Sequence, residues 1–191
     1  LMGCATTTTQ RLQLPPLESV SQVDLNRYAG TWFDIANFPR KFQKDCAGTT
    51  ATYTVRSDGD IDVLNSCRYG SLDGELRSKL GRARIADKAT NAKLKVSFFG
   101  PFWGHYWVVD LDEDYQYAAV GHPGRDYLWI LSRTPTLPDA TYQAIVGRLE
   151  TLDYDTSRLV RTQQRPLPVE ESSESGDERQ GEEQLFEGQG R

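Results

Sequence analysis

The sequence predicts an all-β fold: an eight-stranded antiparallel up-and-down β-barrel with one C-terminal α-helix packed outside it. Three observations lead to this fold class. Short runs of alternating apolar and polar residues recur roughly every 8 to 14 residues. A single segment has helical periodicity, and one more short strand follows it. The chain has 191 residues, of which 38% are hydrophobic, and this suits one domain with a real core.

The first four expected strands lie in the N-terminal half of the chain. Residues 32–36 open the series. In residues 47–56, apolar side chains alternate with threonines, which predicts a half-buried strand. Residues 57–60, Ser-Asp-Gly-Asp, are typical of a hairpin turn, and residues 61–66 alternate beyond it. Residues 74–87 form a long and charged fourth strand.

The other four strands are bounded by tight turns. Residues 93–98, 104–112, 115–121 and 126–132 are predicted as strands, and turns at 100–101 and 122–124 bracket the middle pair. After Pro138, apolar residues recur at steps of three and four, which predicts a helix with one apolar face over residues 142–152. A final short strand is expected at residues 158–162.

Composition divides the chain into four parts. Residues 166–191 carry a net charge of about −6 and few apolar residues, so we expect an acidic, disordered tail. Residues 24–165 are the expected barrel, and residues 4–23 a linker with no sustained periodicity. The remainder of the chain before the tail has a net charge of about +1 and no basic stripe, which argues against nucleic-acid binding.

The first residues are typical of a bacterial lipoprotein signal. Leu1-Met2-Gly3-Cys4 reads as the end of such a signal, with residues 1–3 its remnant and Cys4 the lipidated residue. Ala5 after the cysteine, rather than Asp, suits sorting to the outer membrane of a Gram-negative cell. The sequence therefore predicts attachment to a membrane through an N-terminal lipid. No apolar run reaches the roughly 18 residues that a membrane-spanning helix needs.

Strand alternation assigns ten side chains to the barrel interior, and these are the candidate lipid-binding residues. Eight strands enclose a space that is filled by side chains or holds one small ligand, so alternation alone leaves a packed core and a lined cavity as alternatives. Tyrosine hydroxyls near the mouth are expected to hold a carboxylate or a headgroup. The ten residues are Tyr53, Leu94, Val96, Phe98, Tyr106, Val108, Tyr117, Tyr127, Trp129 and Leu131.

Several motifs in order resemble the lipocalin family. Gly30-Thr31-Trp32 matches its Gly-X-Trp motif, and residues 127–133 resemble its last-strand motif, which ends in Arg. Residues 112–117 lie at the position of its middle motif and match that motif only loosely. Residues 97–104 and 131–136 are similar to bacterial lipocalins, outer-membrane lipoproteins related to apolipoprotein D. The similarity covers roughly residues 23–164.

This resemblance implies a barrel open at one end. Trp32 would close the base with Arg133 across its ring, a structural contact between a cation and an indole face. It also implies storage or transport of fatty acids or lysophospholipids on the periplasmic side of the outer membrane, in envelope maintenance. Strand polarity puts residues 99–103 at the open end, where exposed aromatic rings suit a membrane or an entering lipid. The alternative is that the loop of residues 38–42 covers this hairpin.

Two cysteines remain once Cys4 is assigned to lipidation. In an oxidising periplasm an even remainder favours a disulfide between Cys46 and Cys67. The register expected from the Asp58-Gly59 turn places Cys67 opposite Thr50, so a bulge must close the gap. The spacing of the two residues does not match a Cys-X-X-Cys motif, so we expect neither a redox role nor a zinc site.

No metal, cofactor or enzyme motif is present. The Asp110-X-Asp112-X-Asp114 run has Tyr115 and Gly121 where a calcium loop needs Gly and Glu, so we read it as a solvated loop. His105 and His122 have no partner at ligand spacing, and the nucleophile, zinc-protease and phosphate-loop signatures do not occur.

The function favoured by the sequence is reversible lipid binding without covalent chemistry. Two alternatives stay open. One is a tetrapyrrole or other hydrophobic ligand, and the other is a structural lipoprotein that binds a protein partner. The sequence also leaves open whether two barrels associate as a homodimer.

Overall fold

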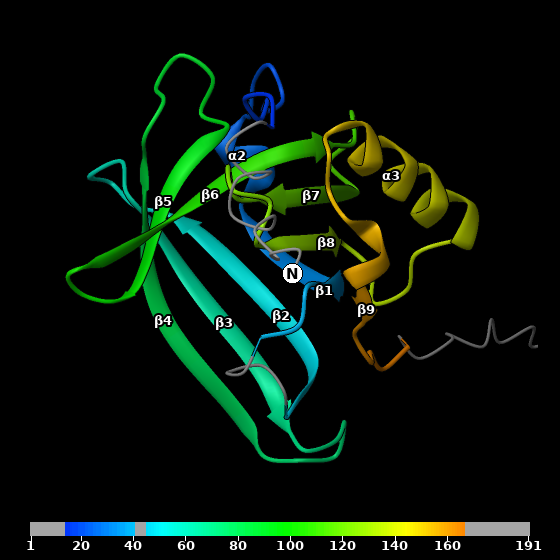
Figure 1. The fold of residues 1–191 in the computed structure, drawn as a ribbon. Helices are drawn as coiled ribbons and strands as arrows, with labels where there is room; N and C mark the ends of the chain where they lie inside the picture. The colour runs from blue at the N-terminus through cyan, green and yellow to red at the C-terminus, as the bar shows by residue number, and fades with distance from the viewer. Residues whose placement is uncertain (1–13, 41–44, 167–191) are drawn as a thin grey trace, which may run out of the picture.

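The computed structural model describes residues 14–40 and 45–166, which form a closed barrel with a helix on its outer face (Figure 1). The strands pair antiparallel in the order β2-β3-β4-β5-β6-β7-β8-β1-β9, and a pairing of β1 with β2 closes the barrel. The predicted eight-stranded barrel with a helix outside is therefore confirmed. In chain order the elements are α2 (Leu25–Tyr28), β1 (Gly30–Asn37), β2 (Cys46–Val55), β3 (Ile61–Tyr69), β4 (Leu76–Ile85), β5 (Lys93–Phe99), β6 (Phe102–Leu111), β7 (Tyr117–Gly121), β8 (Leu128–Ser132), α3 (Asp139–Thr151), η2 (Thr156–Arg158) and β9 (Val160–Arg161).

The observed bounds differ from the predicted ones where local geometry intervenes. Strand β7 begins two residues late because Tyr115, with a φ of 59°, lies in the turn before it. Helix α3 begins directly after Pro138, earlier than the apolar periodicity suggests. The sequence analysis did not predict α2. Its N-cap is Asp24, whose carboxylate accepts hydrogen bonds from the backbone N–H groups of Asn26 and Arg27.

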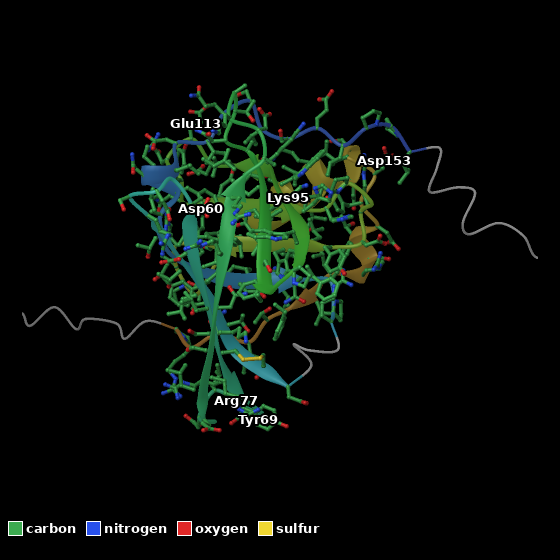
Figure 2. All side chains as sticks on the ribbon, turned by 90° about the vertical axis from the view of Figure 1, so that its left-hand side faces the viewer. Asp60, Tyr69, Arg77, Lys95, Glu113 and Asp153 are labelled. Carbon is green, nitrogen blue, oxygen red and sulfur yellow. A yellow bond between two sulfur atoms is a disulfide. The ribbon has the colours of Figure 1, made fainter. Side chains whose placement is uncertain are left out.

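The barrel has a closed end and an open end. Successive antiparallel strands place alternate turns at opposite ends, and the turns after β4 and β6 meet the segment around α2. Val23 donates its backbone N–H to Thr90 O at 2.8 Å, and Arg27 Nη2 donates to Glu113 O at 2.9 Å. Figure 2 shows Glu113 near one end of the barrel and Tyr69, the last residue of β3, at the opposite, open end.

Strand β1 changes partners halfway along its length. On one side, its first half pairs with β2 and its second half with β9. On the other side it pairs with β8, with a register shift between Asp34 and Ala36. Gln164 bridges the seam, because its Nε2 donates to Asp34 O and Thr49 O, each at 2.8 Å. The C-terminal strand therefore completes the wall where β1 and β2 separate.

Two apolar clusters lie on opposite sides of the barrel wall. The interior cluster includes Trp32 and Leu94, and both are almost fully buried. The outer cluster lies under α3, whose Tyr142, Ile145 and Leu149 are buried. Figure 1 shows α3 alongside β7 and β8. The wall therefore has apolar side chains on both faces, which a simple inside-outside alternation does not anticipate.

Part of the predicted linker packs against the barrel. Leu17 is buried in the outer cluster and Val23 in the interior cluster, and Val20 donates its backbone N–H to Val108 O at 2.9 Å. The linker prediction is therefore wrong for this stretch. Cys4 and the acidic tail from residue 167 onward lie outside the described residues. Among the helices of the described segments, none combines the length and apolar character that crossing a bilayer requires.

Candidate functional site

The interior cluster contains most of the candidate lipid-binding residues. Each lies on the face of its strand that points away from α3, as the alternation predicts. These residues come from four strands, β2, β5, β6 and β8, and meet in one apolar interior. The residues found there are Tyr53, Leu94, Val96, Phe98, Tyr106, Val108, Trp129 and Leu131.

The inward assignment is wrong for Tyr117. This side chain packs in the outer cluster, and Arg148 Nη2 of α3 donates to its hydroxyl at 3.2 Å. In β7 it is Ala118 and Val120 that face the interior. The prediction rested on strand alternation alone, but α3 supplies an apolar surface outside the barrel that buries Tyr117.

The closed end is built around Trp32, which is fully buried. The predicted contact with Arg133 is present, with the guanidinium carbon 3.8 Å from the indole centroid. Arg133 also donates to the backbone carbonyls of Thr31 and Arg27 at 3.1 and 2.6 Å. Trp32 Nε1 donates to Tyr28 O at 2.8 Å. These contacts join α2, β1 and the end of β8.

Three tyrosine hydroxyls form a chain above this base. The Tyr28 and Tyr106 hydroxyl oxygens are 2.7 Å apart, and the Tyr106 hydroxyl donates to Tyr53 at 2.8 Å. Burial is the largest cause of the raised pKa of each hydroxyl, and it brings the pKa of Tyr53 to about 12. The hydroxyls of Tyr53 and Tyr106 lie near the closed end, because Tyr53 pairs with Gly30 at the start of β1. They are therefore not among the mouth hydroxyls that were expected to hold a headgroup.

At and above the level of the tyrosines, several inward-facing side chains of the interior cluster are only partly buried. Trp32 and Tyr28 at the closed end are at 0% and 2% exposure. The barrel is therefore most tightly filled around Trp32 and Tyr28. The partly exposed wall residues are Ala51, Val96, Phe98, Tyr106 and Trp129.

The open end carries exposed aromatic rings. Phe99 and Phe102, at the turn between β5 and β6, are 68% and 77% exposed. The alternative that the loop of residues 38–42 covers them is not supported in its described part, because Phe38 is buried in the outer cluster instead. Phe42 lies outside the described residues. The rings at the mouth are therefore available to solvent.

Cations lie over several of the rings at this end. Lys79 Nζ is 4.3 Å from the centroid of the Phe99 ring, and the guanidinium carbon of Arg40 is 3.3 Å from that of Tyr127. Tyr127, 36% exposed, also stacks on Trp129 with centroids 6.0 Å apart. The inward assignment is therefore wrong for Tyr127, which is an exposed residue at the open end and is not part of the interior cluster.

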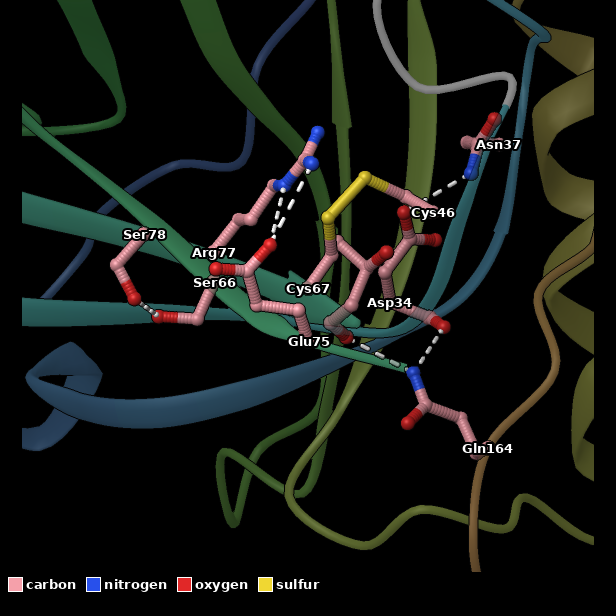
Figure 3. The surroundings of a disulfide bond; sticks show 10 residues. Asp34, Asn37, Cys46, Ser66, Cys67, Glu75, Arg77, Ser78 and Gln164 are labelled. Atoms are coloured by element: carbon pink, nitrogen blue, oxygen red, sulfur yellow. Dashed lines mark hydrogen bonds and ion pairs between the residues drawn. A yellow bond between two sulfur atoms is a disulfide. The ribbon is translucent and has the colours of Figure 1, made fainter. Parts of the chain in front are cut away.

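The predicted disulfide joins Cys46 to Cys67, with Cα atoms 5.4 Å apart (Figure 3). The expected bulge is present as a register shift between Ala47 and Thr50, where Gly48 has a φ of +59°. The predicted register was wrong by one residue, because Thr50 pairs with Ser66 and not with Cys67. The bond therefore ties β2 to β3 near the open end.

Asp34 is a buried acid beside this disulfide (Figure 3). Its carboxylate accepts hydrogen bonds from Asn37 Nδ2 at 2.9 Å and Thr162 Oγ1 at 3.1 Å. Burial raises its pKa to about 7, although both hydrogen bonds lower it. The sequence analysis missed this residue. The available signal was a single acid within the apolar run of β1, two positions after Trp32.

The two histidines meet in space although they are far apart in the sequence. The rings of His105 and His122 have centroids 5.4 Å apart. Within the described segments, no group of three His, Cys, Asp or Glu side chains is placed to hold a metal ion. Tyr28 was also missed, because its role depends on α2 bringing it against β2 and β6.

Comparison with known proteins agrees with this architecture. Residues 23–164 match the family model described as a Lipocalin-like domain. The chain is 43% identical over 145 residues to the outer membrane lipoprotein Blc of Escherichia coli K12, covering 76% of this chain and 81% of that protein. Mouse apolipoprotein D is 30% identical over 164 residues, covering 81% and 82% of the two chains.

A solved structure gives the same fold. Insecticyanin from the tobacco hornworm Manduca sexta superposes with a TM-score of 0.64 at 25% identity, covering 80% of this chain and 86% of that one. The family match spans the whole barrel, α3 and β9. The chain therefore belongs to the lipocalin family.

Proposed function

We propose that this lipocalin binds single-chain lipids, namely fatty acids and lysophospholipids, inside its barrel. As a lipocalin it acts by binding a ligand and not by catalysis. The observation that carries the proposal is the set of inward-facing apolar side chains that stay partly exposed, including Val96, Phe98 and Trp129. Burying each methylene of an acyl chain there contributes about 0.8 kcal/mol. Roughly ten methylenes then offset the cost of immobilising a flexible chain.

The mouth suits an anionic headgroup. Arg40 and Lys79 lie over aromatic rings at the open end. Their positive charges are therefore placed to bind the carboxylate or phosphate of a lipid headgroup at the mouth. The exposed rings of Phe99 and Phe102 suit contact with a lipid surface during entry. We therefore assign the headgroup to the mouth and the acyl chain to the interior.

The proposed location is the periplasmic side of the outer membrane. Gly3-Cys4 supports lipidation at Cys4, and the similarity to an outer membrane lipoprotein supports the destination. Storage or transport of lipids there would serve envelope maintenance. Labelling of the chain by an alkyne analogue of palmitate, in a Gram-negative host that supplies an intact signal, tests the anchor. Loss of the label in Cys4→Ser is expected, and an equal label in both would contradict it.

Mass spectrometry of co-purified lipid tests the binding itself. Residues 5–191 are purified without the anchor and extracted with organic solvent. Fatty acids or lysophospholipids near one per barrel would support the proposal and identify the headgroup. An empty extract, together with unchanged tryptophan fluorescence on adding either lipid, would contradict it and favour a structural scaffold.

An aromatic ligand such as a tetrapyrrole is a second candidate. It is favoured by the stacked pair of Tyr127 and Trp129, of which Trp129 belongs to the interior cluster. A visible absorption band of the purified protein would support this candidate, and a spectrum limited to protein absorption would remove it.

A further inference from the structure

The three-tyrosine chain at the closed end has three hydroxyl protons, but its two hydrogen bonds use only two of them. Tyr106 has a single hydroxyl proton and donates it to Tyr53. The contact between Tyr28 and Tyr106 must therefore use the proton of Tyr28. The proton of Tyr53 is the third, and no described residue accepts it.

This donor is buried but can be reached from the interior. Tyr53 is only 5% exposed, and a buried donor without an acceptor costs free energy. Its neighbour Tyr106 is partly exposed and belongs to the same interior cluster, so a ligand that entered the interior would reach these hydroxyls. Asp34 is near enough to act electrostatically on Tyr53, but its oxygens accept from Asn37 and Thr162 instead.

The surroundings of this donor disfavour a negative charge. Burial raises the pKa of the three tyrosines and of Asp34, which means that the site penalises anions. Arg133, the cation over Trp32, is already engaged by backbone carbonyls. A neutral oxygen therefore suits the hydroxyl of Tyr53 better than a carboxylate does.

We infer that Tyr53 binds a neutral oxygen acceptor, such as a keto or hydroxyl group, on the deep end of the bound lipid. The site favours acyl chains that carry such a group far from the headgroup. This inference rests on the proposed function, since it assumes that the headgroup stays at the mouth and the chain descends into the interior.

Two matched ligands and two matched variants test it. Dodecanoic acid and 11-oxododecanoic acid share a carboxylate and differ by one carbonyl at the deep end. Tyr53→Phe removes the free donor. Tyr28→Phe removes a hydroxyl at the other end of the chain and leaves the donor of Tyr53 in place. Dissociation constants for both acids are measured by displacement of a fluorescent probe, and thermal unfolding checks that each variant folds.

Tyr53→Phe should weaken binding of the oxo acid about three- to tenfold, the range for one neutral hydrogen bond, and should leave dodecanoic acid unchanged or tighter. Tyr28→Phe should leave the ratio between the two acids unchanged. In the wild type, the carbonyl stretch of the bound oxo acid should move to lower frequency, and Tyr53→Phe should reverse the shift.

The results separate the inference from the proposed function. If both acids bind and Tyr53→Phe affects them equally, the donor serves only water and the inference is wrong while lipid binding stands. If Tyr28→Phe has the selective effect, the chain of protons runs the other way and Tyr53 is the wrong residue. If neither acid binds the wild type, the proposed function fails, and the inference fails with it.

Discussion

The guanidinium carbon of Arg133 lies 3.8 Å from the centroid of the Trp32 indole ring, at the closed end of the barrel. The same guanidinium donates to Thr31 O, Arg27 O and Tyr115 O. One side chain therefore connects the end of β8 to α2, to β1 and to the turn before β7. Such a contact closes the base of the barrel.

Loss of Arg133 should destabilise the barrel. Arg133→Ala removes several hydrogen bonds from a charged donor, and we expect the free energy of unfolding to fall by roughly 2–4 kcal/mol in a urea titration. Arg133→Lys should recover only part of this, because an ammonium lacks the planar fork. Arg77→Ala is the control, since Arg77 lies over the exposed ring of Tyr69 and should cost under about 1 kcal/mol. Equal losses for Arg133→Ala and the control would contradict this role.

Asp34 should make stability depend on pH. Its pKa rises from 3.8 to about 7 on folding, so the folded state binds a proton more tightly than the unfolded state. The stabilisation is therefore complete below about pH 4 and is lost as the pH rises to about 7, at a slope of up to about 1.4 kcal/mol per pH unit. Asp34→Asn should flatten this part of the curve, measured by urea unfolding at each pH. A curve with the same slope in the variant would assign the dependence to other groups.

Removal of the disulfide should cost stability without abolishing the fold. Cys46 and Cys67 are 21 residues apart. Closing a loop of that length lowers the entropy of the unfolded chain, which stabilises the fold by about 3 kcal/mol at 25 °C. The Cys46→Ala/Cys67→Ala variant should lose about that much in chemical denaturation. The wild type in reductant should match the variant. A variant as stable as the oxidised wild type would show that the bond has no net effect.

Trp129 should report lipid binding. It faces the interior and is partly exposed, whereas Trp107 lies in the outer cluster with Lys93 Nζ 4.4 Å from its ring centroid. Trp129→Phe should therefore remove most of the fluorescence change that a lysophospholipid causes, and Trp107→Phe should keep it. The opposite pattern would place the ligand outside the barrel.

The exposed rings at the mouth should speed the uptake of lipid from a bilayer. Replacing Phe99 and Phe102 by Ser should slow extraction of a fluorescent fatty acid from phosphatidylglycerol vesicles several-fold, because the rings no longer enter the interface. Binding of the same fatty acid from solution should change little. A slower rate from both sources would mean that the rings act within the site and not at the membrane.

The strands and the long helix were predictable because local patterns encode them. Alternation in residues 47–56 and the Asp58-Gly59 turn define one hairpin, and three- and four-residue spacing after Pro138 defines the apolar face of α3. Helix α2 was not predicted because four residues are too few to show a helical periodicity. Its signal was the cap at Asp24 alone.

The sequence by itself determined the fold class, most strand positions and the inward parity of residues such as Leu94 and Trp129, because side-chain alternation is a local property of a strand. The tertiary structure alone decided which face α3 covers, and so why Tyr117 lies outside. It also decided that Tyr28, Tyr53 and Tyr106 join in one chain and that Asp34 is buried beside Thr162. Those contacts connect segments far apart in the chain. Whether these residues meet depends on how the barrel closes, and a local sequence pattern does not contain that information.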